Sequence, residues 1–512
     1  MTIIQQGAVN TNALLVPDVY IQVVPPSENF LNGVPTNGLG VVGTAQWGPV
    51  NAPTILGSIA DYVQKFGNIV ARKFDGGTAI WAAVLNGANN IRFVRVTDGT
   101  DLAATGVFGV NGLTLTGKYS GSLGNLVSLA ISAGSQSNTW RAVISMPGLV
   151  PEVFDNIGAG LTGNALWVAI ANAINNGVSG IRTASELVIA AAGSSTASPS
   201  AGSITLAGGT DGAANVTTNH LIGQDTVPRK GMYALRKSGV ANAMLVDCDD
   251  SSTYSTQLAF GLDEGIYMIA VRPAGDTISA AVAAKSAAGV DSYALRLMHG
   301  DWIFFNDTVN NQVRLISPQG FIAGRLSALA PQESALNKPL YGIVATQRTQ
   351  QNLPYSQAEL QALAQAGIDV ITNPIPAGDS FGSRIGCNTS SNAVINGDNY
   401  PRLTNYIAKT LNAGMGIYVG KLQSPKSRAD VSGTVNAFLM NMWQQGMIGD
   451  VNDAQKVPFS IQINRANNPS SRVALGYMQV DVRITYLSVT TKLIINVEGG
   501  QSVKITNAGL VQ

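Results

Sequence analysis

Charged side chains are scarce in this chain of 512 residues, and their signs nearly cancel. Asp, Glu, Lys and Arg make up 12% of the residues, where about 25% is usual for a globular protein. The formal net charge of +1 leaves no excess of cations to neutralise phosphates, which argues against a dedicated nucleic-acid-binding protein. Copies of such a chain repel one another weakly, so the composition suits a protein that lives in an assembly, although an ordinary globular protein could share it.

Cysteine is rarer still. The two cysteines, Cys248 and Cys387, are too few and too far apart for a disulfide framework or a zinc site. We expect both to be buried as small apolar side chains, and we expect no metal and no cofactor.

Long apolar runs are absent as well. None reaches the ~18–20 residues that a membrane-spanning helix needs, and the longest candidates, such as 166–174, fit buried helices. The first positively charged side chain is Lys65, so the charged start of a signal peptide is missing. We therefore expect a protein that is made in the cytosol, stays soluble until it assembles and does not insert into a membrane.

What the chain has in quantity is glycine, with 56 residues, and short strand-like and helix-like patterns between turns. Changes in composition predict an N-terminal extended arm, a first α/β piece, a β-rich outer insertion, an α/β middle domain, a C-terminal core domain and a C-terminal arm. The predicted boundaries are 1–24, 25–97, 98–212, 213–345, 346–497 and 498–512. The predicted fold class is therefore α/β, with several domains.

Helix-capping residues and the alternation of strand-like and helix-like runs support this division. Ser58 and Thr78 are predicted to cap two helices of the first α/β piece. In the middle domain, strand-like runs at 243–246 and 267–271 alternate with helical patterns, which predicts βαβ units and a largely parallel sheet. The helical patterns lie at 229–237, 253–262 and 276–288.

The last third of the chain has the clearest periodicity. A helix from about Ser427 is predicted because its apolar residues fall on one stripe. These are Val431, Val435, Phe438, Leu439, Met442 and Trp443. Apolar and polar residues alternate from Met478 to Tyr486, and the pattern is repeated at 493–497, which predicts two half-buried strands.

Three short motifs match enzyme signatures, but each lacks the context that its chemistry needs. Gly38–Gly43 spells G-x-G-x-x-G, yet no helix follows to offer its N-terminus to a pyrophosphate. Gly112–Lys118 approaches a P-loop, yet Tyr119 stands where a magnesium-binding hydroxyl is required. Gly378–Gly382 matches the nucleophile elbow, yet both histidines of the chain precede its serine, which rules out the chain order of that hydrolase fold.

Three aspartates, Asp247, Asp249 and Asp250, follow a predicted parallel strand at the end where α/β folds place ligands. They are the best candidates in the chain for metal or phosphate chemistry. No Gly-rich phosphate cradle accompanies them, so we favour a solvated loop and a helix cap with Ser251 and Ser252. An α/β enzyme that uses this cluster stays an alternative.

Several short segments follow one another in a recognisable order. Pro17–Val23 (PDVYIQV) is close to Pro-Gly-Val-Tyr-Ile-x-Glu, with Asp18 in place of the glycine and Val23 in place of the acid. The further segments are 42–51 (VGTAQWGPVN), 62–67 (YVQKFG), 81–87 (WAAVLNG), 93–96 (FVRV), 119–125 (YSGSLGN), 317–320 (SPQG) with 323–324 (AG), and 476–484 (GYMQVDVRI). In this order they resemble the contractile tail sheath proteins of bacteriophages and related injection machines.

The resemblance implies a structural subunit rather than an enzyme. It implies a helical homopolymer of stacked hexameric rings that surrounds a tail tube, meets baseplate and tail terminator proteins, and contracts to drive the tube through the host envelope. It also implies a discontinuous core domain built from both chain ends, in a virion tail assembled in the host cytoplasm. Another self-assembling protein, such as a surface-layer or tail component, is the second alternative.

In such a sheath the terminal arms of one subunit are expected to add strands to the sheets of its neighbours, because an edge strand offers unpaired N–H and C=O groups. The residues expected to pair between subunits are Val19, Tyr20, Ile21, Val23, Val503, Ile505 and Leu510. The predicted tube-facing residues are Lys421, Lys426 and Arg428. Deletion of 1–17 or of 506–512 is expected to leave a folded monomer that cannot polymerise.

Overall fold

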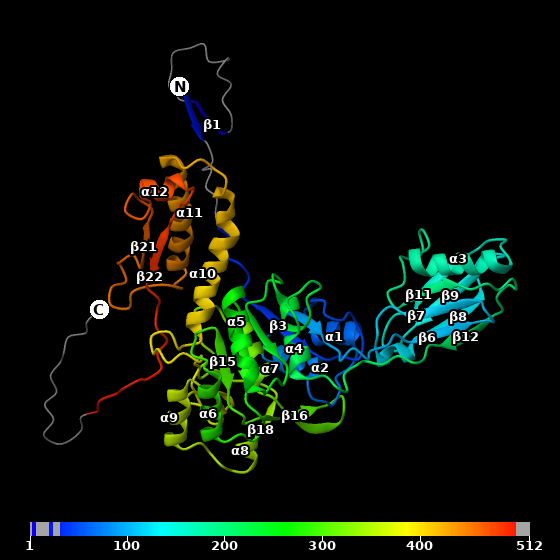
Figure 1. The fold of residues 1–512 in the computed structure, drawn as a ribbon, viewed down its shortest axis with the longest axis horizontal. Helices are drawn as coiled ribbons and strands as arrows, with labels where there is room; N and C mark the ends of the chain where they lie inside the picture. The colour runs from blue at the N-terminus through cyan, green and yellow to red at the C-terminus, as the bar shows by residue number, and fades with distance from the viewer. Residues whose placement is uncertain (1–2, 7–19, 24–30, 498–512) are drawn as a thin grey trace.

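The computed structural model describes residues 3–6, 20–23 and 31–497. Residues 31–97 and 213–398 form a central body, residues 98–212 form an insertion that projects to one side, and residues 399–487 form a C-terminal body (Figure 1). The predicted class, α/β with several domains, is confirmed.

The central body is built on a six-stranded sheet in the order β15-β14-β13-β3-β5-β4. The strands are β3 (Gly38–Gly43), β4 (Thr54–Leu56), β5 (Asn90–Arg95), β13 (Asn242–Leu245), β14 (Tyr267–Val271) and β15 (Leu295–Met298). Neighbours are parallel except for β4, which is antiparallel to β5. The parallel sheet predicted for the middle domain is confirmed, and it also takes in two parallel strands from the first α/β piece.

Helices cover both faces of this sheet, which explains why its inner strands are buried on both sides. One face carries α1 (Ile59–Phe66), α2 (Gly76–Leu85) and α7 (Gln319–Ala328). The other carries α5 (Tyr254–Glu264), α6 (Ile278–Ala288) and α9 (Gln357–Ala366). The smaller elements are α4 (Thr218–Ile222), α8 (Gln347–Gln350), the antiparallel strands β16 (Ile303–Asp307), β17 (Gln312–Ile316) and β18 (Ile343–Thr346), and the pair β19 (Ile371–Thr372) and β20 (Gly382–Ser383).

Of the two capping residues predicted for the first α/β piece, one is confirmed and one is wrong. Ser58 caps α1 as predicted, because its Oγ accepts a hydrogen bond from the backbone N–H of Asp61 at 3.2 Å. The prediction for α2 was wrong: the cap is Asp75, whose carboxylate accepts the N–H of Thr78 at 2.8 Å and its hydroxyl at 2.7 Å. A carboxylate competes better than a hydroxyl for the free N–H groups at the positive end of a helix.

One predicted helix is missing from the middle domain. At 229–237 the chain forms only a short 3₁₀ turn, Gly231–Leu235. Gly231 has a φ of +58°, outside the right-handed helical region, and this interrupts the pattern. The other two helical patterns of that domain became α5 and α6.

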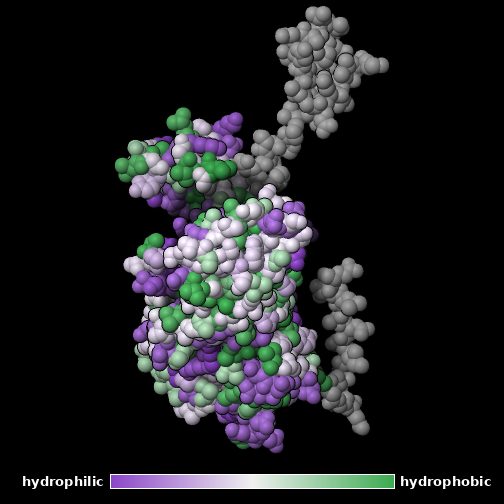
Figure 2. All heavy atoms as spheres, turned by 90° about the vertical axis from the view of Figure 1, so that its right-hand side faces the viewer, coloured by the Kyte–Doolittle hydropathy of each residue, from purple (hydrophilic) through white to green (hydrophobic). Residues whose placement is uncertain are grey.

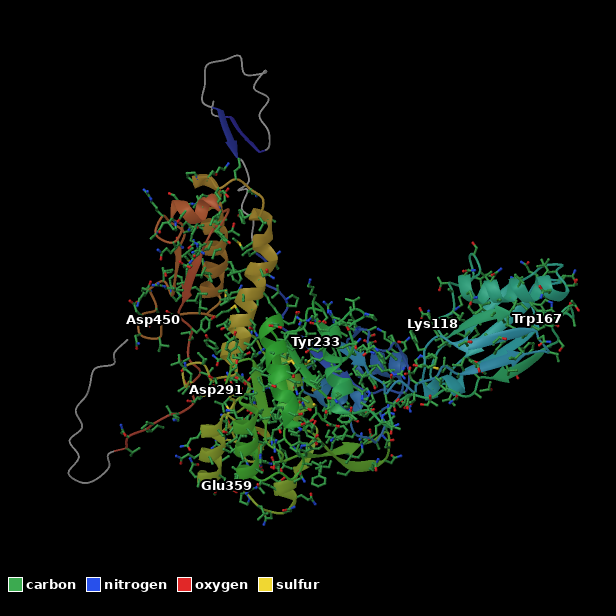
Figure 3. The ribbon with its side chains drawn as sticks, in the orientation of Figure 1. Lys118, Trp167, Tyr233, Asp291, Glu359 and Asp450 are labelled. Carbon is green, nitrogen blue, oxygen red and sulfur yellow. The ribbon has the colours of Figure 1, made fainter. Side chains whose placement is uncertain are left out.

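The insertion has a core of its own. It contains the sheets β11-β7-β6 and β10-β9-β8-β12, with helix α3 (Gly163–Asn176) packed on them. The strands are β6 (Thr105–Phe108), β7 (Leu113–Gly117), β8 (Ser128–Ala133), β9 (Trp140–Ser145), β10 (Glu152–Ile157), β11 (Val188–Ala192) and β12 (Gly202–Thr205). Figure 3 shows Lys118 near the central body and Trp167 toward the far end of the insertion.

Two arginines fasten the insertion to the central body: Arg72 forms an ion pair with Asp211 at 2.5 Å, and Arg95 binds backbone oxygens on both sides. Arg95, at the end of β5, is fully buried. Its guanidinium donates to the backbone oxygens of Gly48 at 2.7 Å, Ser120 at 2.6 Å and Asp211 at 3.0 Å. Because Ser120 and Asp211 are far apart in the sequence of the insertion, the Arg95 side chain joins two of its segments to the central body.

Candidate subunit interface

The C-terminal body is a small helical unit with an exposed sheet. Helices α10 (Asn399–Met415) and α11 (Pro425–Gln444) pack around Leu403, Phe438 and Leu439. The stripe predicted on the second helix is confirmed, and α11 begins two residues before Ser427 because Ser424 caps it and Pro425 occupies the first turn.

The sheet of this body has only two strands. β21 (Phe459–Gln462) pairs with β22 (Asp481–Ile484) in antiparallel register, with Ile461 opposite Val482. Within the described residues, neither strand has a second partner strand, so both edges of the sheet are open. The apolar side chains of both strands contact the helices but stay only half-buried. A two-stranded sheet of this kind is marginal by itself and is a template for added strands.

The segment that follows is extended and exposed. Residues 488–497 form no helix or strand, so the strand predicted at 493–497 is wrong for the single chain. Leu493, Ile494, Ile495 and Val497 are each more than 70% exposed. Within the described chain, no neighbouring strand pairs with this alternating segment. Such an apolar run gains free energy only when another surface covers it.

The described part of the N-terminal arm contains a short ladder. β1 (Ile3–Gln6) pairs with β2 (Tyr20–Val23) in parallel, with Ile3 opposite Tyr20. Of the residues predicted to pair between subunits, Tyr20, Ile21 and Val23 therefore lie on β2 and have an intrachain partner strand. Val19, Val503, Ile505 and Leu510 lie outside the described residues.

The root of this arm runs along α10. The backbone N–H of Val34 donates to the Thr410 hydroxyl at 3.2 Å, and Leu31 packs against the apolar core of the C-terminal body. The arm thus leaves the central body in contact with the same unit that carries the open sheet (Figure 1).

The predicted tube-facing residues lie together on one end of the C-terminal body. Lys421 is in the turn between α10 and α11, with its ammonium 4.9 Å from the Tyr418 ring, while Lys426 and Arg428 are in the first turn of α11. In the described part of the chain none of the three cations forms an ion pair. Val419 and Leu422, beside Lys421, are 85% and 90% exposed. This end is therefore both apolar and cationic.

The three aspartates of the candidate catalytic cluster have separate structural tasks. The Asp247 carboxylate accepts the backbone N–H of Phe74 at 3.1 Å, and burial raises its pKa. Asp249 forms an ion pair with Lys73 at 3.0 Å. A cap is present as predicted, but the capping residue is Asp250 and not Ser251 or Ser252: Asp250 caps the turn Ser251–Thr253, and hydrogen bonds from Ser252 lower its pKa. The described residues contain no group of three or more His, Cys, Asp or Glu side chains placed to hold a metal ion.

The three enzyme-like motifs fall in unsuitable structure. Gly38–Gly43 is the buried strand β3, and most of Gly112–Lys118 is strand β7. Gly378–Gly382 lies in a turn that leads into β20, without the following helix of a nucleophile elbow. Cys248 and Cys387 are buried and unpaired, as predicted. Among the described residues, no helix is long and apolar enough to cross a membrane.

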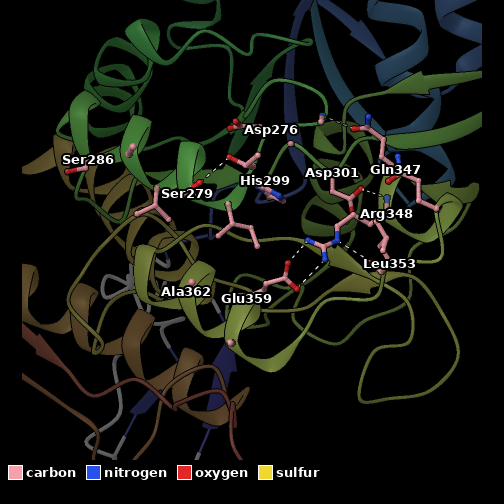
Figure 4. A pocket seen from close by; sticks show the side chains of 18 residues that line it. Asp276, Ser279, Ser286, His299, Asp301, Gln347, Arg348, Leu353, Glu359 and Ala362 are labelled. Atoms are coloured by element: carbon pink, nitrogen blue, oxygen red, sulfur yellow. Dashed lines mark hydrogen bonds and ion pairs between the residues drawn. The ribbon is translucent and has the colours of Figure 1, made fainter.

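A groove of about 1120 Å³ lies between α6, α9 and the loops after β14 and β15 (Figure 4). Its charged groups are already paired. Arg348 binds Glu359 through two hydrogen bonds of 2.9 and 3.1 Å, and Asp301 accepts the backbone N–H of Arg348 at 3.0 Å. Burial lowers the pKa of His299 to about 4, so this side chain is neutral at physiological pH.

No protein-family model matches the sequence, and a search of curated proteins finds no relative. Solved structures do match, and they define the fold as that of contractile tail sheath proteins. The sheath tail protein from Desulfitobacterium hafniense is 17% identical, with a TM-score of 0.57 over 86% of this chain and 92% of that chain. The sheath tail protein from Listeria innocua is 14% identical, with a TM-score of 0.60 over 85% and 90%.

A third match extends over almost the full length. The sheath of the extracellular contractile injection system PVC, solved in its contracted state, is 11% identical, with a TM-score of 0.55 over 97% of this chain and 99% of that chain. At such identities the likeness establishes the fold. It agrees with the resemblance that the sequence motifs carry.

Proposed function

We propose that this chain is the structural subunit of a contractile tail sheath. It polymerises as stacked hexameric rings around a tail tube, in the tail of a phage-like particle assembled in the host cytoplasm, and contracts to drive the tube through the host envelope. Its partners are further copies of itself, the tube protein, and the baseplate and tail terminator proteins. It acts by assembly and not as an enzyme.

The observation that carries this proposal is the pair of unmatched elements at the C-terminal end. Within the part of the chain that the structure describes, the two-stranded sheet β21–β22 has no neighbouring strand and no element covers the apolar segment 493–497. Strands from other copies would satisfy both at once, since added backbone pairs with the edges and the apolar side chains become buried. Residues of β2 and the residues 503–510 would take part through the same pairing.

Contraction in this proposal moves whole subunits. In this proposal the arms stay paired with neighbouring copies and act as tethers while the bodies rotate and form new contacts. The free energy would be stored at assembly. No nucleotide is required, which is consistent with the motif at 112–118 being a strand.

Strand addition can be tested by electron microscopy of the purified protein in negative stain. The native chain is expected to form long, hollow, striated tubes. The double variant Leu493→Asp with Ile495→Asp should stay monomeric and folded, because carboxylates at both positions cannot be buried in a neighbour's core. Val110→Asp with Val150→Asp is the matched control: these valines are 87% and 86% exposed on the insertion, and tubes should persist. Normal tubes from the first variant would contradict the proposal.

Tube contact can be tested separately. We propose that Lys421, Lys426 and Arg428 face the tube, and the triple change to Glu should abolish co-sedimentation with purified tube protein. Self-assembly of the sheath alone should continue, since strand addition uses other residues. Unchanged co-sedimentation would remove these cations from the tube contact.

A further inference from the structure

Helix α10 belongs to two bodies at once. Its N-terminal part lies beside the central body, and its full length belongs to the C-terminal body (Figure 1). Leu403 and Ile407 turn one face of the helix into the apolar core of the C-terminal body. Arg402 and Lys409 turn another face toward the central body, where they meet polar groups. The two bodies are therefore joined through one helix with two different faces.

Arg402 grips the end of another helix. Its guanidinium donates to the backbone oxygens of Leu326 at 2.7 Å and Leu329 at 2.6 Å, at the C-terminal end of α7. It also donates to Ala330 at 3.0 Å and Glu333 at 2.9 Å. Four backbone carbonyls at the end of α7 and in the turn after it thus converge on one planar guanidinium group, and those of Leu326 and Ala330 also accept backbone N–H groups.

Asp398, the residue before α10, is also bonded to the central body. Asp398 and Arg296 of β15 are both fully buried, and the guanidinium donates to the carboxylate at 2.7 Å. The same guanidinium contacts Asp369 and donates to the Ser383 hydroxyl at 2.8 Å. Asp398 also accepts the backbone N–H of Ala335 at 3.0 Å. The start of α10 is thereby bonded to the edge strand of the sheet.

A third tie lies two turns further along α10. The ammonium of Lys409 donates to the backbone oxygen of Val240 at 2.9 Å, just before β13. Burial lowers the pKa of Lys409 to about 8 and that of Arg402 to about 10, so both cations are held at a cost in desolvation. Buried charges contribute little net stability compared with apolar packing, but their hydrogen bonds fix direction, whereas an apolar contact can slide.

We infer that Arg296, Arg402 and Lys409 are positioning residues that fix the direction in which α10 leaves the central body. This fixed arrangement of the central body and the C-terminal body is a property of the single chain. If the chain is a sheath subunit, as proposed above, these residues also determine where the open sheet β21–β22 is presented to the neighbouring copies. The central body and the C-terminal body then move as one unit.

The test is a distance between the two bodies in the monomer, measured with the changes Leu493→Asp and Ile495→Asp, which are expected to prevent assembly. Spin labels would be placed on two exposed positions, Ser286→Cys on α6 and Asn436→Cys on α11, with both native thiols buried. Pulsed electron spin resonance should give one narrow distance distribution for the otherwise native chain. Arg402→Met and Arg402→Lys should both broaden it, because neither side chain can hold four carbonyls. Lys409→Met is the second variant, should Arg402→Met not fold.

Three readings decide the outcome. Arg465→Met is the matched control, since Arg465 is exposed and forms no ion pair in the described chain, and it should keep the narrow distribution. A role in stability alone would lower the thermal midpoint of the variants without broadening the distribution, which would overturn the inference. In microscopy, the Arg402 and Lys409 variants with native Leu493 and Ile495 should give tubes of irregular diameter. Failure of the native chain to form tubes would count against the sheath proposal only, since the distances are measured in the monomer.

Discussion

Asp75 shows at the scale of one residue how capping competes with burial. It is 1% exposed, caps α2, and has one carboxylate oxygen without a hydrogen-bond partner in the described structure. Burial raises its pKa to about 6, and the hydrogen bonds from Thr78 lower it only in part. The native state therefore binds a proton at this site more tightly than the unfolded chain does. The stability that this contributes is present below about pH 4 and is lost as the pH rises through 6.

The variant Asp75→Asn should separate these effects, because the amide keeps an acceptor for the cap and does not ionise. At pH 7.5 we expect it to be more stable than the native chain by about 1–3 kcal/mol, and at pH 4 nearly equal. Urea unfolding at the two pH values measures the difference. The exposed Asp263→Asn serves as the control and should show no such change. A native chain that is the more stable of the two at pH 7.5 would refute this account.

Residue-level prediction from the sequence worked where the cause is local. Ser58 as a cap and the burial of both cysteines depend on chemistry within a few residues or on apolar character alone. The roles of Asp247 and Asp249 were ambiguous, because their partners Phe74 and Lys73 are more than 170 positions away in the chain. The roles of Arg296, Arg402 and Lys409 were missed for the same reason.

At the scale of elements, α2 and α7 cross at very short range because both carry small residues. A Cβ on Gly320 would lie 2.7 Å from the backbone oxygen of Ala79, and one on Gly324 would meet Ala83 more closely still. The two glycines are four positions apart and so lie on one face of α7. Because both residues are glycines, α7 can lie this close to α2 on the sheet.

We expect Gly324→Ala to destabilise the protein by about 1–3 kcal/mol, because the added methyl group must push two helices apart. Gly433→Ala on α11 is the matched control: nothing lies within 4 Å of its Cβ position, and the change should stabilise by up to about 1 kcal/mol. Thermal unfolding of the two variants distinguishes packing from helix propensity. A stabilised Gly324→Ala variant would show that the crossing is loose.

Elements with strong periodicity were predicted well, and those shaped by tertiary contacts were not. The apolar stripe of α11 and the alternation around β22 stand out in the sequence. Helix α10 does not stand out in the sequence. One of its faces carries Arg402 and Lys409, which bond to the central body, so the usual contrast between an apolar face and a solvated face is lost. The open edge strand β21 was also missed, although Phe459 and Ile461 alternate with polar residues.

At the scale of the whole molecule, the insertion is a separable part. Its two ends meet, since the backbone N–H of Asp98 donates to the oxygen of Gly212 at 2.7 Å, and its apolar core contains only its own residues. Figure 2, which faces the insertion, shows apolar and intermediate residues mixed with hydrophilic ones and not a strongly polar coat. This surface agrees with the low charge content of the chain.

Replacement of residues 99–211 by a short Gly-Ser linker should therefore leave the rest of the chain folded. Arg95 then loses the oxygens of Ser120 and Asp211, so we expect lower stability but a cooperative transition. Calorimetry of this variant and of the isolated 98–212 fragment provides the measurement. Loss of cooperative unfolding in both would show that the parts depend on each other.

The sequence by itself determined the weakly charged composition, the α/β class, the parallel strands at 243–246 and 267–271, and the ordered motifs that resemble sheath proteins. These follow from local periodicity, capping and composition. Only the tertiary structure decided that β3 and β5 join those strands in one sheet, and that among the described residues β21–β22 keeps two open edges and 493–497 has no partner strand. Such features depend on pairing between segments far apart in the chain, or on its absence, and local patterns carry no information about which distant segment completes them.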